Sequence, residues 1–161
     1  TASRSPYYVV HQVYIRPNVT LSVQNGVEII FMGSYQIYVR GHLNIGCQFV
    51  DTSLYTTHRG IIPNIPSHSY IHSDLLNRQG YIYLQDYGAP SSASFCNAKF
   101  EGLYYALYDG SGGSAEVYID NTEYHNNYYG AYTYTSATSN VHQIHDSVFT
   151  QNRYGFYGKF D

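Results

Sequence analysis

Short apolar runs and turn residues alternate along the whole chain. The runs are three to five residues long and rich in β-branched and aromatic side chains, as in Val13-Tyr14-Ile15 and Ile37-Tyr38-Val39. Gly, Asn and Pro bound them, for example at Pro17-Asn18 and Asn25-Gly26. Because alternation with a period of two indicates β-strands, and no segment keeps the period of a helix, we predict an all-β chain.

The runs recur at a nearly constant spacing. Three stretches share the pattern apolar-x-Asn/Asp-x-x-aromatic: 95–100, 119–124 and 144–149. A tyrosine-rich unit follows each of them: at 105–108, 129–132 and 154–157. The offsets are 24 and 25 residues, and in the N-terminal part Thr20–Val23 matches His42–Ile45 at an offset of 22. Short strands that repeat at this spacing indicate a solenoid.

We therefore predict a parallel β-helix in which each repeat of 22 to 25 residues forms one coil and residues 1–161 form one domain. Coils stack at about 4.8 Å, so equivalent residues lie over one another. One column is expected to form a polar ladder at a turn, where Asn121 is expected to be buried: Asn97, Asn121 and Asp146. Another is expected to form an aromatic stack in the core: Phe100, Tyr124 and Phe149. The Leu-x-x-Leu-x-Leu pattern of the competing leucine-rich solenoid is missing.

The N-terminal quarter of the chain resembles secreted right-handed parallel β-helix proteins. These typically read Ser-Pro-Tyr-x-Val, then Pro-x-x-Thr-Leu-x-Ile-x-x-Gly-Val-x-Ile-x-Phe, then Ile-x-Val-x-Gly-x-Leu. Here the matching residues are Ser5, Pro6, Tyr7, Val9, Pro17, Thr20, Leu21, Val23, Gly26, Val27, Ile29, Phe31, Ile37, Val39, Gly41 and Leu43.

The Asn-x-x-Phe and Gly-x-Tyr units of residues 95–157 are similar to the NosD-like repeat of the pectin-lyase-like superfamily. The two resemblances imply a single-stranded right-handed parallel β-helix. They do not select a function, because this architecture serves lyases, hydrolases, adhesins and purely structural proteins.

Composition narrows the classes of partner. Charged residues make up 12% of the chain and the formal net charge is −3, so we expect no nucleic-acid partner and no attraction to anionic membranes. The sequence has no run of about 18 apolar residues, and we expect no membrane span.

A secreted or surface location is expected. The chain starts at Thr1 without Met, as it would after loss of a signal peptide or as a shortened chain, and it stops partway through a coil. We therefore expect either a fragment or one subunit of a longer stack. Asn18-Val19-Thr20 is the only glycosylation sequon, and Asn18 follows Pro17 at a turn, where an outward side chain is a candidate glycan acceptor. The alternative is a chance tripeptide.

Cys47 and Cys96 are the only cysteines, and a disulfide between them fits an oxidising compartment. Two full coils would separate equivalent positions by roughly 9.6 Å, beyond disulfide reach, so the bond requires that residues 51–80 add no complete coil between them. This stretch has two prolines and little alternation, and we expect an irregular excursion there. The alternative is two separate buried thiols.

We identify no catalytic residue and expect no cofactor. The seven aspartates scatter, whereas β-helix lyases and hydrolases typically cluster acidic residues, and no Gly-x-Ser-x-Gly elbow occurs. Asp120, His145 and Cys96 fall in one predicted outward column with His142 near them, and these residue types bind Zn²⁺ or Cu²⁺. A solvent-exposed polar column explains the same pattern, so we predict no metal site.

The chain has 21 tyrosines and no tryptophan. If Leu107, Ala131 and Phe156 point inward, alternation sends the tyrosines that follow them outward. The predicted face holds Tyr108, Tyr132 and Tyr157, with Tyr134 beside them. A second column is expected at the adjoining bend: Tyr105, Tyr129 and Tyr154. A contiguous exposed aromatic patch usually marks an interaction site.

These features suggest a non-enzymatic extracellular structural module. We expect it to pack through its tyrosine-rich faces, by self-association or with another subunit, into a surface fibre, appendage or matrix. The alternative is a carbohydrate-binding or carbohydrate-active β-helix whose tyrosines stack on sugar rings.

Overall fold

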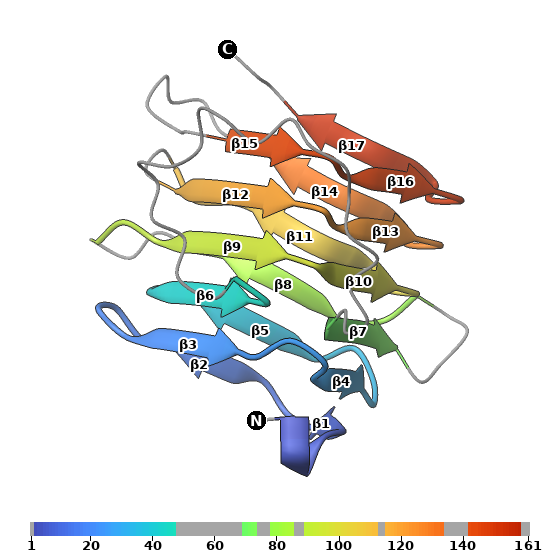
Figure 1. Ribbon diagram of the computed structural model, residues 1–161. Helices are drawn as coiled ribbons and strands as arrows, with labels where there is room; N and C mark the ends of the chain where they lie inside the picture. The colour runs from blue at the N-terminus through green and yellow to red at the C-terminus, as the bar shows by residue number, and fades with distance from the viewer. Residues whose placement is uncertain are drawn as a thin grey trace.

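In the computed structural model the chain is an all-β parallel solenoid of about five turns (Figure 1). The structure describes residues 2–47, 69–73, 78–85, 89–112, 115–133 and 142–158, and every structural statement below concerns these residues. Within them the only helical element is a short 3-10 turn, η1 (Ala2–Arg4). Each coil contributes one strand to each of three sheets, which we name A, B and C in the order in which the chain visits them.

All neighbouring strands pair in parallel. Sheet A contains β1 (Tyr7–Val9), β4 (Glu28–Phe31), β7 (Ser69–Ser73), β10 (Ala98–Glu101), β13 (Glu123–His125) and β16 (Val148–Thr150). Sheet B contains β2 (Val13–Ile15), β5 (Gln36–Val39), β8 (Tyr81–Leu84), β11 (Tyr105–Asp109), β14 (Tyr129–Thr133) and β17 (Tyr154–Gly158). Sheet C contains β3 (Thr20–Val23), β6 (His42–Ile45), β9 (Ser92–Cys96), β12 (Glu116–Asp120) and β15 (His142–His145).

The strand register confirms the predicted repeats. Ile119 pairs with Phe95 on one side and with Ile144 on the other, as the sequence offsets require. In Figure 1 the chain crosses the front in sheet C, returns behind in sheet B and climbs with each turn, which makes the solenoid right-handed. This is the hand that parallel strands almost always adopt when they are joined by crossovers.

Aromatic rings stack through the core at the equivalent position of successive coils. The ring centroids of Phe100 and Tyr124 are 5.1 Å apart, and those of Tyr124 and Phe149 are 4.6 Å apart with nearly parallel planes. Phe95 packs against Phe100 from sheet C. Phe95, Phe100 and Tyr124 are fully buried. The predicted core stack is therefore confirmed.

The predicted polar ladder lies at the bend between sheets C and A. Its three members have positive φ angles, 51° at Asn97, 45° at Asn121 and 43° at Asp146, a conformation that Asn and Asp tolerate better than most residues. The amide of Asn121 donates to the side-chain oxygen of Asn97 over 2.7 Å. The expectation that this ladder is buried is wrong, because Asn121 is only half-buried and Asp146 is exposed.

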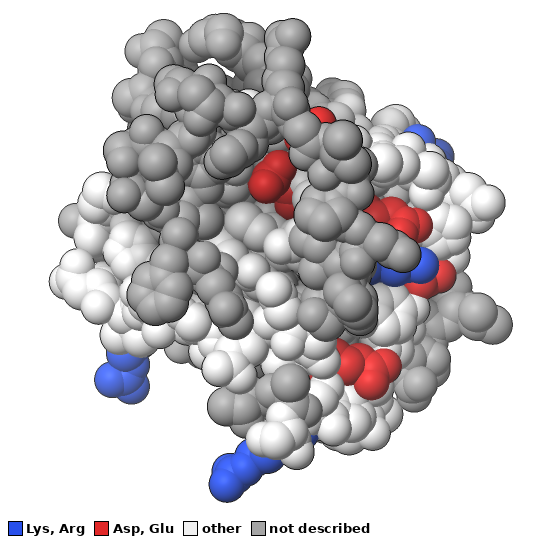
Figure 2. All heavy atoms as spheres, viewed as in Figure 1, with Lys and Arg blue, Asp and Glu red and all other residues white. Residues whose placement is uncertain are grey.

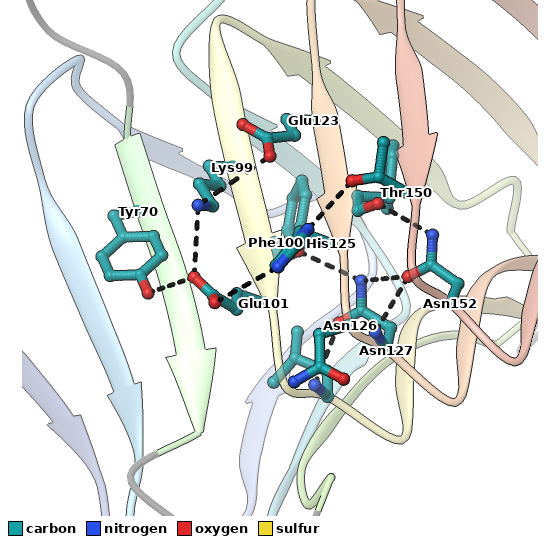
Figure 3. Close-up of polar contacts among 12 residues, drawn as sticks. Tyr70, Lys99, Phe100, Glu101, Glu123, His125, Asn126, Asn127, Thr150 and Asn152 are labelled. Atoms are coloured by element: carbon teal, nitrogen blue, oxygen red, sulfur yellow. Dashed lines mark hydrogen bonds and ion pairs between the residues drawn. The ribbon is translucent and has the colours of Figure 1, made fainter. Parts of the chain in front are cut away.

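A second asparagine ladder is buried at the next bend, between sheets A and B (Figure 3). Asn127 has no exposed surface, and its side chain accepts from the backbone N–H of Leu103 and donates to the carbonyl of Phe100. Asn152 repeats this arrangement one coil later, because its amide donates to the carbonyl of Tyr124. These amides satisfy backbone groups that the turn would otherwise leave unpaired inside the protein.

Cys47 and Cys96 form the predicted disulfide, with their Cα atoms 4.9 Å apart. Cys47 follows β6 and Cys96 ends β9, and these strands are direct neighbours in sheet C, so one coil step separates the cysteines and not two. Gly46 lets the two coils approach closely here, since a Cβ on it would overlap the carbonyl oxygen of Cys96.

Part of the stretch predicted to be irregular, 51–80, is regular. Ser69–Ser73 is the regular strand β7, in which Ser69 and Ile71 are buried and Tyr70 lies between them on the outer side. Residues 48–68 and 74–77 lie outside the described residues. The sequence obscures β7 because its alternation rests on one apolar residue, Ile71, flanked by serines.

Asn127→Ala is expected to lower the free energy of unfolding by on the order of 3 kcal/mol, because it leaves the Leu103 N–H and the Phe100 carbonyl buried without a partner. The matched control is Asn121→Gly, which keeps the positive φ accessible and removes only a half-exposed hydrogen bond, at a cost of about 1 kcal/mol. Urea unfolding followed by circular dichroism measures both. A larger loss in the control would contradict the assignment of the buried ladder.

Reduction of the disulfide is expected to destabilise the fold without unravelling the register of the coils. The cysteines are 49 residues apart in sequence, so freeing them restores chain entropy to the unfolded state worth about 4 kcal/mol in the loop-closure treatment. Cys47→Ser together with Cys96→Ser provides a reductant-free test in thermal unfolding. An unchanged melting temperature in both the reduced protein and the double variant would refute this prediction.

Candidate functional site

A column of six tyrosines runs along the outer face of sheet B. Strand register places one tyrosine from each strand over the next, so that every coil adds one ring. We name this column the first ladder: Tyr14, Tyr38, Tyr83, Tyr108, Tyr132 and Tyr157. The centroids of successive rings are 4.8 to 5.6 Å apart, which is close to the spacing of the strands themselves.

A second ladder runs beside the first on the same face: Tyr81, Tyr105, Tyr129 and Tyr154. Its rings approach to 4.7 Å between Tyr105 and Tyr129 and to 4.8 Å between Tyr129 and Tyr154. At the adjoining bend Tyr104 stacks on Tyr128, and the guanidinium of Arg153 lies 4.8 Å from the Tyr128 ring. The ladders also touch each other, for example where Tyr105 meets Tyr132 edge to face.

An irregularity in the strands brings both ladders to one face. Tyr105 and Tyr108 are three residues apart, which strict alternation would send to opposite faces. The register between β8 and β11 shifts between these residues, and Ala106 and Leu107 are both buried between them. The column of Ala106 is glycine in the next coils, where a Cβ on Gly130 would overlap Gly155 and the Phe149 ring. This bulge widens the tyrosine face from one column to two.

The stacked rings cover one another's faces. The planes of Tyr105 and Tyr129 meet at 7°, those of Tyr129 and Tyr154 at 13°, and those of Tyr132 and Tyr157 at 14°. Tyr14 and Tyr157, at the two ends of the first ladder, are about half exposed, at 50% and 51%, whereas the rings between them are half-buried. Where the planes are nearly parallel, as in the second ladder, a partner meets mainly ring edges and hydroxyl groups. The middle rings of the first ladder are tilted by 42° to 46° to one another.

The neighbouring phenols oppose ionisation. Burial and the charges that Tyr104, Tyr129 and the other ring neighbours would carry raise the pKa of Tyr105 to about 12. The same causes, burial first and then adjacent tyrosines, raise the pKa of Tyr38, Tyr83 and Tyr129 above the ordinary value. These four tyrosines therefore remain uncharged at neutral and mildly alkaline pH.

The sequence correctly identified two tyrosine columns but found only their C-terminal half. Tyr108, Tyr132 and Tyr157 pair as predicted, and so do Tyr105, Tyr129 and Tyr154, while Tyr134 lies outside the described residues. Four members were missed, Tyr14, Tyr38, Tyr83 and Tyr81, and so was the stacked pair Tyr104 and Tyr128 at the adjoining bend. The sequence match of Val13-Tyr14-Ile15 with Ile37-Tyr38-Val39 could have identified Tyr14 and Tyr38 as a stacked pair. Tyr81 and Tyr83 follow the stretch that was interpreted as irregular.

Sheet A carries a polar network on its outer side (Figure 3). The Tyr70 hydroxyl donates to Glu101, Lys99 lies 3.3 Å from the same carboxylate, and His125 lies 3.9 Å from it. Burial alone would raise the pKa of Glu101, but the hydrogen bonds from Tyr70 and Lys99 and the positive charge of Lys99 hold it below its ordinary value. Lys99 also lies 3.8 Å from Glu123, so one lysine is shared by two carboxylates of the network.

The predicted outward position of His142 is wrong. His142 pairs with the buried Val117, so its ring points into the solenoid, where its side chain is 5% exposed and Nε2 lies 3.4 Å from a carboxylate oxygen of Asp109. Asp109 is fully buried and accepts hydrogen bonds from the backbone N–H and the hydroxyl of Ser111. Burial lowers the pKa of His142, and the Asp109 charge opposes this only in part.

The column considered for a metal does exist in the strand register. Asp120 pairs with Cys96 and with His145. Cys96 is part of the disulfide and His142 faces the interior, so two of the four considered ligands cannot bind a metal ion at this column. Burial and the nearby charge of Asp146 raise the pKa of Asp120. No group of three or more His, Cys, Asp or Glu side chains that could hold a metal ion occurs among the described residues.

Charge is dispersed over the described surface. On the side drawn in Figure 2, one basic side chain lies next to acidic ones, and other basic side chains stand apart from them. Asn18 is exposed, in the turn between β2 and β3, with a φ angle of 59°. Within the described ranges no helix is both long and apolar enough to cross a membrane.

Comparison with protein-family models, curated proteins and solved structures found no match to this chain. The class of the protein therefore rests on its own geometry. It is a right-handed parallel β-solenoid with one disulfide and a doubled tyrosine ladder on one sheet.

The solenoid is expected to lose stability as the pH rises from 10 to 12. A tyrosine that ionises at about 12 in the folded chain and at its ordinary 10.0 in the unfolded chain holds its proton more tightly when folded. Its contribution is complete below pH 10 and disappears as the pH passes through the folded pKa. Tyrosinate absorbance and circular dichroism, recorded together, measure the effect, and Tyr105→Phe should shift the loss to higher pH. Titration of all phenols in one step near pH 10 with no change in stability would contradict it.

Proposed function

We propose that this solenoid is a non-enzymatic extracellular structural module that assembles with further copies of itself through the tyrosine face of sheet B. The observation that carries the proposal is the first ladder, in which six successive strands each present a tyrosine at the same position. An aromatic side chain with a polar tip suits a surface that is covered in one state and wet in another. The row of tyrosines extends over the whole described stack, and a contiguous exposed aromatic patch of this kind usually marks an interaction site.

A second copy is the partner whose spacing matches. Two identical faces carry rings at the same interval of about 4.8 Å, so the ring edges and hydroxyl groups of one copy can align with those of the other along the whole row. The outward residues of the sheet B strands are tyrosine or glutamine, and Asp109 in β11 points inward. The strands themselves therefore present no like charges to an identical face, and Arg40 lies at the N-terminal end of the face, over Tyr14.

The size of the face predicts weak pairing that strengthens in an array. Six strands at about 4.8 Å span roughly 24 Å, and two columns of half-buried rings offer a few hundred Å² per copy. Stable pairs usually bury about 1,000 Å² or more in total, so two isolated copies should associate only weakly. Many copies aligned in a fibre, appendage or matrix would gain affinity through repeated contact.

Sugar stacking is the less favoured alternative because ring faces that a sugar would cover are occupied by neighbouring rings from Tyr105 to Tyr154 in the second ladder and between Tyr132 and Tyr157 in the first. The extracellular assignment is supported by the disulfide and by the exposed sequon residue Asn18. Membership of the secreted NosD-like or pectin-lyase-like β-helix proteins is part of this proposal and rests on the sequence resemblance together with the shared fold.

Replacing Tyr108, Tyr132 and Tyr157 by serine is expected to abolish self-association while the chain still folds. The change removes a few hundred Å² of contact area, worth several kcal/mol of association at roughly 25 cal/mol per Å² before opposing costs. The three substitutions also remove eight ring contacts, so the melting temperature is expected to fall as well. Sedimentation over a wide concentration range measures association, and circular dichroism measures folding.

The control is Tyr8→Ser with Tyr118→Ser, which removes tyrosines from sheets A and C and should leave association intact. A wild-type chain that remains monomeric at high concentration would refute the proposal. Equal association of the triple variant would show that another face mediates contact. Binding of a glycan on an array, lost in the triple variant, would favour the sugar alternative.

A further inference from the structure

Tyrosine is the side chain of this protein that most readily gives up an electron. The chain has no tryptophan, a single methionine and two cysteines, and both cysteines are already joined in the disulfide. A one-electron oxidant therefore acts on the tyrosines. Ten of them stand in the two ladders, with neighbouring ring centroids within 6 Å.

Contact between the rings lets an unpaired electron move along the face. Within the first ladder successive centroids are at most 5.6 Å apart, and edge-to-face contacts such as Tyr129 with Tyr132, at 5.1 Å, connect the two ladders. Aromatic groups at van der Waals contact exchange electrons readily. Oxidation at any ring can thus be followed by transfer to another ring, and the final site is set by local charge and access.

The two ends of the first ladder differ in local charge. At the N-terminal end the guanidinium of Arg40 lies 5.4 Å from the centroid of Tyr14, and a fixed positive charge opposes loss of an electron from that ring. Tyr157, at the C-terminal end, is equally exposed, at 51% against 50%, and stacks on Tyr132. The cation contacts found near this end fall on the rings of Tyr128 and Tyr154.

We infer that the tyrosine ladders form a site of oxidative cross-linking, in which radicals generated anywhere on the face collect at Tyr157 and join two copies of the chain there. The juxtaposition of stacked rings with one exposed ring at the end of the described first ladder carries this inference. It does not rest on the proposed assembly, because two copies that meet only by diffusion can couple in the same way.

The chemistry balances with a peroxide as oxidant. Each of two tyrosines loses one electron and its phenolic proton, giving two phenoxyl radicals. These form one carbon–carbon bond between ring carbons adjacent to the oxygens, and each ring then moves the hydrogen of that carbon to its oxygen and becomes aromatic again. The two electrons and two protons released reduce one hydrogen peroxide to two waters through a haem peroxidase. The product is a dityrosine link between chains.

Tyr8 provides the matched control. It is more exposed than Tyr157, at 57%, yet it enters none of the ring contacts found among the described residues. If exposure alone determined the site, Tyr8 would be the preferred position. If the ladders collect the radical, Tyr157 is preferred although it is slightly less exposed.

The test treats the full chain with a haem peroxidase and hydrogen peroxide, at a concentration at which sedimentation finds only monomer. We expect a dimer that resists reductant and denaturant, dityrosine fluorescence, and a link that peptide mass spectrometry places at Tyr157. Tyr157→Phe should lose most of the dimer, whereas Tyr8→Phe should retain it, with circular dichroism confirming that both variants fold.

Two results would overturn the inference. One is a cross-link at Tyr8 with a yield equal to or above that at Tyr157, which would show that access alone selects the site. The other is the absence of covalent dimer from wild-type protein whose tyrosines have been oxidised. Self-association is measured in a separate experiment, so failure here leaves the assembly proposal standing, and failure of assembly leaves this inference standing.

Discussion

The parallel stacking of coils at one fixed spacing is the constraint on which the rest of this structure depends. Every backbone hydrogen bond of a strand goes to the coil before or after it, so equivalent residues are held over one another at about 4.8 Å. A side chain therefore meets a counterpart at the same position, and residues that interact well with themselves are favoured there. Aromatic rings stack, amides form chains of hydrogen bonds, and unpaired charges are excluded.

The same constraint explains the composition of the bends. Each turn must reverse direction at the same place in every coil, which requires left-handed backbone at Asn97, Asn121 and Asp146. The buried bend adds a second requirement, since its backbone groups cannot reach water. Asn127 and Asn152 meet it with side-chain amides. The disulfide joins the coil that ends with β6 to the coil that ends with β9, and these two strands pair in register.

Outward and inward columns of the stack carry different kinds of polar side chain. Outward columns pair complementary charges, as around Glu101, or repeat a neutral phenol along sheet B. The inward pair of Asp109 and His142 is an exception, because it places ionisable groups inside a column that is otherwise apolar. A phenol can repeat without electrostatic cost while it remains protonated, and the raised pKa of Tyr105 extends that range. A tyrosine column can therefore gain a ring with each further coil without charge repulsion.

The sequence by itself determined the coil length, the strand class and the columns of the C-terminal half, because equivalent residues recur there at nearly constant offsets with little insertion. It also determined that Phe100, Tyr124 and Phe149 share a core column. Only the tertiary structure showed how the coils continue after Ile45. The residues between β6 and β7 interrupt the repeat, so the sequence does not show which residues of β7, β8 and β9 pair with the preceding coil. The reach of the tyrosine ladders to Tyr14 depends on that register. The side to which His142 points was likewise decided by its pairing with Val117, and the burial of Asn127 by the backbone groups around it, because local alternation carries no information on either.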